Sequence, residues 1–231
     1  GSCGNSVSLL IVLLAALVYY LYNFLGFPLE LSYFPNDRCT LVGKEKMVGS
    51  EDLTHYKNGI YFVSSGDLHH VFNQGVEGAH PGGIFTVDLK DNSVKQVPMN
   101  GAPAAIPFQP HGIFFSNSSR RLYAISHGHD KGGSRIFVFK VVDLPSLSLS
   151  FERSILSAVF LNSGINDVVE GGEPGEIYVT KWLLYPIPVK GKKNPQNLQE
   201  KLQLLGNDLL PMVDARTAVY RCTYAVDNET P

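Results

Sequence analysis

Three short polar stretches recur along this chain at nearly even intervals. The first contains Glu51 and Asp52, the second His111, and the third Asn166 and Asp167. Asp52 and His111 are 59 residues apart, and His111 and Asp167 are 56 residues apart. This regular spacing indicates one supersecondary unit that is used several times, with polar residues at the same place in each unit.

A turn and two strands of similar sequence accompany each polar stretch. The second strands are β-branched and aromatic, as strands of a sheet usually are: Ile60–Ser64, Leu122–Ser126 and Ile177–Thr180. The third strands match one another as well: Gly83–Leu89, Arg135–Val141 and Ala218–Tyr224. Because a repeat of about 40–60 residues with about four short strands is typical of a propeller blade, the sequence predicts an all-β propeller.

The composition fits a folded domain and excludes several classes of protein. Hydrophobic residues make up 44% of the chain and charged residues 17%, which is typical of a globular domain. The net charge of -2 gives no basic field, so we expect no nucleic-acid partner. The sequence contains no Gly-rich phosphate loop, no Gly-x-Ser-x-Gly nucleophile turn and no His-x-x-x-His zinc motif.

An apolar segment runs from Val7 to Leu25, and no charged side chain precedes Glu30. As a helix, these 19 residues would span about 28 Å, close to the thickness of the hydrocarbon core of a bilayer. A cleaved signal peptide would have a shorter apolar region and a small-residue cleavage site, which is missing after Ala16. A buried core helix would show a polar stripe. We therefore expect residues 1–28 to form a signal anchor or a retained signal peptide that holds the protein on a membrane.

Either kind of leader would direct the rest of the chain into the secretory pathway, to the extracellular or lumenal side, as an anchored or a secreted protein. Two sequons for N-glycosylation agree with this, at Asn117 and at Asn228. The cysteines are Cys3, Cys39 and Cys222. An odd number of cysteines in an exported chain leaves one without a partner.

A polar segment interrupts the strands between Pro186 and Met212. Asn194 followed by Pro195 is typical of a helix N-cap with Pro at the first helical position. Leucines then recur at helical spacing: Leu198, Leu202, Leu205 and Leu209. We expect an inserted helix near 194–210. Two interpretations stay open with equal weight, a lid or membrane-facing helix and a surface helix that fills a gap.

The polar stretches are candidates for an ion site. The innermost strands of a propeller line a central channel, so polar residues at the same point of successive blades converge on one axis. Glu51, Asp52, Asn166 and Asp167 supply carboxylate and amide oxygens, which calcium prefers, with about six to eight oxygens in its shell. One such pair would be read as strand-capping turn residues. Two pairs in register, with His111 between them, favour the ion site.

Two histidines are candidates for proton transfer. His111 lies between Pro110 and Gly112, and His127 follows 16 residues later, at the end of the second strand of the same unit. Neighbouring histidines can act as a relay in which one takes a proton from water and the other orients it. His129 competes with His127 for this role. The remaining histidines are expected in loops: His55, His69, His70 and His80.

Taken together, these motifs resemble the serum paraoxonase/arylesterase family. In order, the motifs are Gly49–Leu53 with Asn58-Gly59, Phe108–Ile113, Leu122-Tyr123 leading to His127, and Asn166–Val168. The similarity runs from about Asn36 to Tyr224, and the combination in this order is specific. The resemblance implies a six-bladed β-propeller, of which residues 29–231 cover roughly the first three to four blades.

The resemblance also implies an activity and its residues. It implies hydrolysis of lactones and aryl esters, with small-molecule substrates and two calcium ions in the propeller tunnel. Glu51, Asn166 and Asp167 fall on calcium ligands of the family. Asp52 and the backbone carbonyl of Ile113 fall on ligands of the structural ion. His111 and His127 fall on the histidine dyad that activates water.

The chain departs from the family at Lys181-Trp182-Leu183, where the family continues Asn-Asp-His. The family domain extends past Pro231, with further calcium ligands and a cysteine that would form a disulfide with Cys39. We therefore expect the 231-residue chain by itself to be inactive.

A second class of function also stays open, a non-catalytic paraoxonase-like membrane protein that assists the assembly or trafficking of a partner. The intact ligand and dyad positions favour the enzyme, whereas the apolar leader and Lys181-Trp182 favour the second class.

Overall fold

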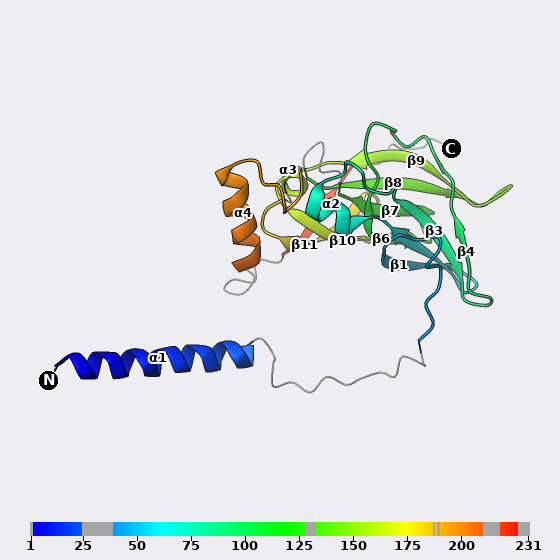
Figure 1. Cartoon of the computed structure of the whole chain (residues 1–231). Coiled ribbons are helices and arrows are strands. Elements are labelled where there is room, and N and C mark those ends of the chain that lie inside the picture. Colours follow the sequence, from blue (N-terminus) through cyan, green and yellow to red (C-terminus); the bar gives the residue numbers. More distant parts are fainter. Residues whose placement is uncertain are drawn as a thin grey trace. The chain divides into compact units, whose positions relative to one another are not determined.

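The chain forms two compact units, residues 1–41 and residues 42–231. A computed structural model describes residues 2–24, 39–127, 133–186, 188, 190–209 and 218–225. The helix that we expected over residues 7–25 is present as α1 (Ser2–Phe24) in the first unit (Figure 1). No helix among the described residues is both long enough and apolar enough to cross a membrane.

The strands of the second unit form three sheets, one for each repeat. The first sheet has the order β1-β2-β3-β4: Ser50–Lys57, Ile60–Ser65, Gly83–Asp88 and Ser93–Gln96. The second has the order β5-β9-β8-β7-β6: Met99–Asn100, Ser148–Ile155, Arg135–Val142, Arg121–Ser126 and Pro110–Ser116. The third has the order β10-β11-β12: Gly164–Glu170, Glu176–Leu183 and Ala218–Thr223. Neighbouring strands are antiparallel, except that β5 is parallel to β9.

Each polar stretch lies on the end strand of its own sheet, and these three strands meet. β6 contacts both β1 and β10. The mostly-β architecture with several sheets is consistent with a β-propeller-like fold (Figure 1). Closure into six blades stays a prediction.

The middle sheet is buried on both faces. Side chains alternate along its strands, so Leu122 and Ala124 of β7 enter one core cluster with the first sheet. Tyr123 and Ile125 of β7 enter a second cluster with the third sheet. A strand that is buried on both sides needs a nearly continuous apolar sequence, which explains the run of apolar residues in β8.

Two short helices were not expected from the sequence, α2 (Leu68–Gln74) and α3 (Ala158–Leu161). The side chain of Asp67 caps α2 by accepting a hydrogen bond from the backbone N–H of His70. The expectation that His69 and His70 lie in a loop was therefore wrong, and so was that for His55, which lies on β1. The seven residues of α2 are too few to show a helical period, but the cap residue was visible.

The inserted helix forms as α4 (Leu198–Leu209), although not with the expected cap. Asn197, rather than Asn194, accepts a hydrogen bond from the backbone N–H of Glu200, at 2.9 Å. Glu200 in turn accepts one from the backbone N–H of Gln196, one residue before the cap, so the bonding resembles a capping box that is displaced by one residue. The segment from Asn194 onward is therefore a turn that precedes the helix.

The leucine stripe of α4 is exposed, as Leu198, Leu202 and Leu205 show. A polar contact joins the helix to the segment after β11, where the buried Asn207 amide bonds the backbone N–H and carbonyl of Tyr185, at 2.9 and 3.0 Å. The gap-filling interpretation of this helix is therefore not supported by its exposed leucines.

A polar network joins the second and third sheets near the end of β10. The Glu170 carboxylate accepts a hydrogen bond from the hydroxyl of Ser116 and one from the hydroxyl of Tyr123, the latter at 2.6 Å. Burial alone would raise the pKa of Glu170, but these hydrogen bonds outweigh it, so the pKa lies below its ordinary value of 4.5. Burial and the bond to Glu170 raise the pKa of Tyr123 far above its ordinary range.

Because the pKa of Glu170 is depressed on folding, its stabilising contribution is present above about pH 4.5 and is lost as the pH falls through the folded value. We expect Glu170→Gln to lower the melting temperature at pH 7, and the gap to wild type to close on acidification below pH 4.5. Glu173→Gln, a change in the adjoining turn, is the control that should leave the profile unchanged. A gap that stays constant down to pH 3 would contradict the expectation.

Candidate active site

The polar pairs emerge at β-bulges. The register of β1 with β2 shifts between Ser50 and Leu53, where Glu51 and Asp52 lie. The same shift occurs in β6 around His111 and Gly112, and in β10 around Asn166 and Asp167. A bulge re-aims the side chains of a strand and is frequent beside active sites. A β-bulge therefore presents polar side chains at the same point of three strands.

Local bonding repeats in the first and third units. The backbone N–H of Asp52 donates to the hydroxyl of Ser64, and that of Asp167 donates to the hydroxyl of Thr180, at 3.1 and 2.9 Å. Each carboxylate also accepts from the next backbone N–H, at 2.7 Å in both cases. The two aspartates are thus held in the same way by their own sheets.

The middle unit has Gly112 where the others have aspartate, and the space requires it. A Cβ at this position would lie 2.3 Å from the backbone oxygen of Asn166 and 2.7 Å from a carboxylate oxygen of Asp167. On the other side, Asp52 accepts a hydrogen bond from the backbone N–H of Ile113, at 2.8 Å. Glycine therefore allows β6 to fit closely between Asp52 and Asp167.

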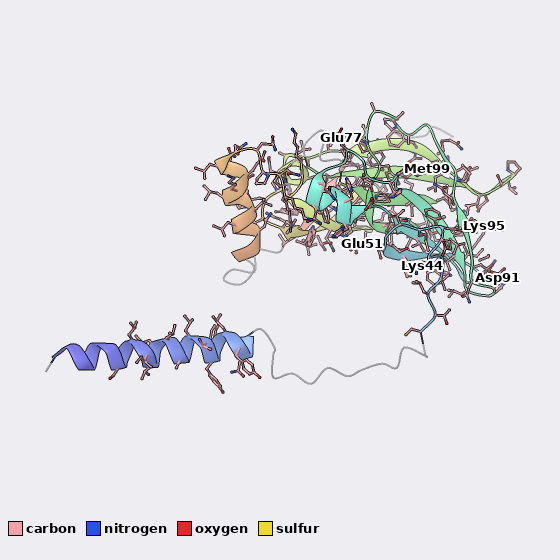
Figure 2. The ribbon with its side chains drawn as sticks, viewed as in Figure 1. Lys44, Glu51, Glu77, Asp91, Lys95 and Met99 are labelled. Atoms are coloured by element: carbon pink, nitrogen blue, oxygen red, sulfur yellow. The ribbon has the colours of Figure 1, made fainter. Side chains whose placement is uncertain are left out.

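His111 and His127 lie in one line of hydrogen bonds. Nδ1 of His111 is 3.1 Å from Nε2 of His127, and Nε2 of His111 is 2.7 Å from a carboxylate oxygen of Glu51. At the far end, Nδ1 of His127 is 2.9 Å from the hydroxyl oxygen of Ser134. His111 is 4% exposed and His127 is 1% exposed. Glu51, at the other end, is exposed and is labelled in Figure 2.

The hydrogen bonds of this line can run in two directions. In the first, the ionised Glu51 carboxylate accepts a proton from Nε2 of His111, Nε2 of His127 donates to Nδ1 of His111, and the hydroxyl of Ser134 donates to Nδ1 of His127. In the reverse direction, Nδ1 of His111 donates to Nε2 of His127, and Nδ1 of His127 donates to the hydroxyl of Ser134. Only the reverse direction leaves Nε2 of His111 without a proton and able to act as a base. Ser134 is compatible with both directions because a hydroxyl can donate and accept.

Ser134 was not expected from the sequence, and it lies seven residues beyond His127, across a segment that is not described. We expect Ser134→Ala to lower kcat of the full-length protein roughly tenfold with little change in KM, because the orientation of His127 is lost. Ser163→Ala is the matched control, since this buried serine bonds a backbone carbonyl instead of a histidine. Equal losses in both variants, or a loss that follows the melting temperature, would remove Ser134 from this role.

The carboxylates beside Gly112 repel each other. Burial raises the pKa of Asp167, and the negative charge of Asp52 raises it further, whereas His111 lowers it. The half-buried side chain of Asn166 adjoins them. Closely spaced oxygen ligands of this kind fit a calcium ion, which would relieve the repulsion. Among the described residues, however, no group of three or more His, Cys, Asp or Glu side chains is arranged to hold a metal.

The other predicted site residues are placed as follows. Asn117 is exposed, in the turn between β6 and β7. Cys39 and Cys222 are both free, and burial raises the pKa of the Cys222 thiol. His129 and Asn228 lie outside the described residues. Ile113 contributes its N–H, and the predicted role of its carbonyl stays a prediction.

Two aromatic side chains that were not predicted as site residues cover the histidines. The ring of Phe72, on α2, lies 5.3 Å from that of His127, and the ring of Trp182, on β11, lies 5.9 Å from that of His111. Trp182 was noted only as a departure from a family pattern. Its place over His111 could not be predicted because the two residues are 71 positions apart in the chain.

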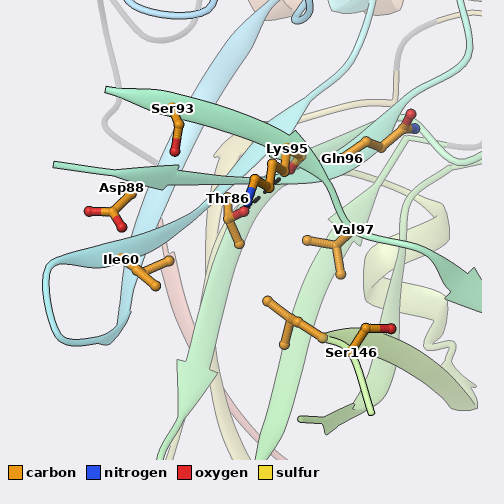
Figure 3. A pocket seen from close by; sticks show the side chains of 9 residues that line it. Ile60, Thr86, Asp88, Ser93, Lys95, Gln96, Val97 and Ser146 are labelled. Atoms are coloured by element: carbon orange, nitrogen blue, oxygen red, sulfur yellow. Dashed lines mark hydrogen bonds between the residues drawn. The ribbon is translucent and has the colours of Figure 1, made fainter. Parts of the chain in front are cut away.

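A pocket of about 340 Å³ lies elsewhere, between the first sheet and the turn that joins β8 to β9 (Figure 3). Its lining includes Ile60, Lys95 and Leu147 but none of the residues described above. Ile60 is at the opposite end of β2 from Ser64, which bonds Asp52. The pocket is therefore separate from the histidines, and Figure 2 shows Lys95, from its lining, apart from Glu51.

A model of the arylesterase family matches residues 31–186 of this chain, more than half of its length. The chain belongs to the arylesterase family. Human serum paraoxonase/arylesterase 1 is 32% identical over 157 residues, which are 66% of this chain and 41% of that protein. Serum paraoxonase/arylesterase 2 of Gallus gallus is 30% identical over 147 residues, 62% of this chain and 39% of that protein.

This arylesterase-family chain thus spans about two fifths of the length of the curated relatives that it matches. Among solved structures, the major allergen Mala s 1 of Malassezia sympodialis matches with 19% identity and a TM-score of 0.40. That alignment covers 62% of this chain and 46% of the allergen, and it is too distant to bear on the fold.

Proposed function

We propose that the full-length protein is a calcium-dependent hydrolase of lactones and aryl esters. The observation that carries the proposal is the buried line of hydrogen bonds from Glu51 through His111 and His127 to Ser134. It lies beside a half-buried carboxylate, that of Asp167, whose pKa is raised. Buried histidines joined to each other and next to acidic groups suit the activation of water. Membership of the arylesterase family supports the same reaction class.

His111 is assigned the role of general base. The side chain of Glu51 is 48% exposed, so it can rotate away from Nε2 of His111. When Nδ1 of His111 donates to His127, Nε2 of His111 is unprotonated and then takes a proton from water, while Nδ1 stays bonded to His127. The hydroxide attacks the ester carbonyl carbon, the carbon–oxygen bond to the leaving group breaks, and the proton on Nε2 passes to the leaving oxygen. His127 and Ser134 keep the imidazole ring oriented throughout.

The residues at the bulges fit a calcium ion. Glu51, Asn166 and Asp167 would hold one ion, and Asp52 with the carbonyl of Ile113 would hold a second. Bound calcium supplies positive charge that favours the developing oxyanion. The part of the chain that the structure describes would contribute side-chain oxygens from β1 and β10 and a backbone carbonyl from β6, which lies between them.

The proposal is tested by the turnover of phenyl acetate and of a simple lactone by the full-length protein, with calcium and after chelation. Calcium-dependent hydrolysis of either substrate is the expected result. A folded, calcium-stabilised protein that hydrolyses no member of an ester and lactone panel would overturn it.

The second candidate is a non-catalytic paraoxonase-like protein that assists the assembly or trafficking of a partner. The exposed leucines of α4 favour it, because a partner could cover them: Leu198, Leu202 and Leu205. The turnover test separates the two functions. Absence of hydrolysis, together with a loss of partner co-purification when the three leucines are changed to Gln, would support this candidate.

We also propose that the protein passes through the secretory pathway. The exposure of Asn117 in the turn between β6 and β7 supports this, since N-linked glycans are carried by surface turns.

A further inference from the structure

Four rings form a closed cluster at the histidines. Phe72 contacts His127 with 5.3 Å between ring centroids, and His127 contacts His111 at 5.0 Å. His111 contacts Trp182 at 5.9 Å, and Trp182 contacts Phe72 at 6.0 Å. Within this cluster, each ring contacts two of the others. The interplanar angles lie between 45° and 64°, in the tilted and edge-to-face range that aromatic pairs favour.

The four rings differ in their access to solvent. Both histidines are buried, whereas Trp182 is 39% exposed and Phe72 is partly buried. Trp182 is the most accessible of the four rings, and its contact with His111 places an accessible aromatic surface next to the proposed base.

Both aromatic side chains are attached to fixed backbone. Phe72 follows the fully buried Val71 on α2, and its carbonyl accepts a hydrogen bond from the backbone N–H of Lys192, at 2.7 Å. Gly191 permits this contact, because a Cβ there would lie 2.3 Å from the backbone of Asn73. The backbone at Gly191 and Lys192 therefore fixes the end of α2 that carries Phe72.

Trp182 is fixed from the other side, on β11. Its neighbour Lys181 pairs with Ile165 and with Ala218, and Leu183 on its other side is buried. The indole N–H of Trp182 donates to no residue that the structure describes. A rigid aromatic surface with a free donor is thus already formed next to the proposed base, so little order has to be created when a flat group binds.

We propose that Trp182 and Phe72 form the subsite for an aromatic ring of the substrate, and that Trp182 is a specificity-determining residue. This inference rests on the proposed function. The ring of an aryl ester would pack on Trp182 while its carbonyl lies at His111. An alkyl ester has no ring to pack there. Trp182 should therefore favour aryl over alkyl esters.

The same position could instead make Trp182 a cover that obstructs His111. The two roles predict opposite effects of truncation. If Trp182 forms a subsite, removal of the indole lowers the turnover of aryl substrates selectively. If Trp182 is a cover, its removal raises the turnover of all substrates alike. The ratio of two substrates in each variant cancels their intrinsic reactivities, so the ratio distinguishes the roles.

The experiment compares kcat/KM of the full-length protein for phenyl acetate and vinyl acetate in wild type, Trp182→Phe and Trp182→Ala. We expect Trp182→Ala to lower the value for phenyl acetate about tenfold, mainly through KM, and to leave vinyl acetate within about twofold. Trp182→Phe should lose less. Tyr178→Ala is the control, because Tyr178 is another exposed aromatic residue of β11. An unchanged ratio, or faster turnover of both esters, would overturn the inference.

A binding measurement tests the subsite without turnover. The emission that Trp182→Phe removes from the fluorescence spectrum belongs to Trp182. We expect phenol to quench this emission in a saturable manner and ethanol to leave it unchanged. Quenching in a protein that hydrolyses nothing would support the subsite and contradict the hydrolase. Hydrolysis without quenching would support the hydrolase and contradict the subsite.

Discussion

His111→Gln is expected to lower kcat for phenyl acetate by about 10²–10⁴-fold, the loss typical of a general base. The melting temperature should change far less, because Gln keeps a polar side chain that can bond Glu51 or His127. The expectation follows from Nε2 of His111, which lies at the exposed end of the line of hydrogen bonds. Steady-state kinetics with phenyl acetate, beside thermal unfolding of the same protein, measure both effects.

His55→Gln is the control for this change, since His55 lies on β1 as an exposed side chain that contacts only the ring of Tyr61 among the described contacts. The control should retain normal turnover. If His111→Gln also turned over substrate at nearly the normal rate, the assignment of His111 and His127 as a dyad would have to be dropped.

Chelation of calcium is expected to abolish turnover and to lower the melting temperature of the full-length protein by about 5–15 °C. This range corresponds to an ion present at roughly 100–1,000 times its dissociation constant, in a domain of this size. The physical cause is the pair of carboxylates beside Gly112, where burial and the charge of Asp52 raise the pKa of Asp167. Differential scanning fluorimetry with and without chelator measures the shift.

Asp167→Asn sharpens this test because its effect should change sign. Without calcium, the substitution removes a repulsion with Asp52, so it should leave the melting temperature equal or raise it. With calcium, it removes a ligand and should lower the melting temperature. Asp91→Asn, at the other end of the strands, should respond to calcium as wild type does (Figure 2). A wild-type melting curve that is unchanged in excess chelator would contradict the calcium site.

The strands could be predicted from sequence because the β-branched and aromatic residues that favour a strand lie next to one another within each repeat. Gly83–Leu89 was expected as a strand and forms β3 over Gly83–Asp88. The sequence also indicated where polar residues recur along the repeat. It could not show the bulges that re-aim them, because a bulge is defined by the register of two strands. The site residues that were missed, Ser134, Phe72 and Trp182, are all placed by contacts distant in sequence.

The helices show the opposite limit. The inserted helix was predictable from its leucine spacing, but leucine spacing does not show which face of a helix contacts the domain. The buried Asn207 makes a polar contact with Tyr185, whereas the leucines of the stripe are exposed. The capping residue of α2, Asp67, was present in the sequence, yet a seven-residue helix offers too little periodicity for recognition.

The burial of the middle sheet on both faces has a consequence for the rate at which the site can open. His111 and His127 belong to or directly follow β6 and β7, and both strands contact neighbouring sheets on either side. Backbone amides in such a sheet exchange their hydrogens with solvent only when much of the domain unfolds. We therefore expect the backbone that carries the histidines to be among the slowest-exchanging parts of the chain.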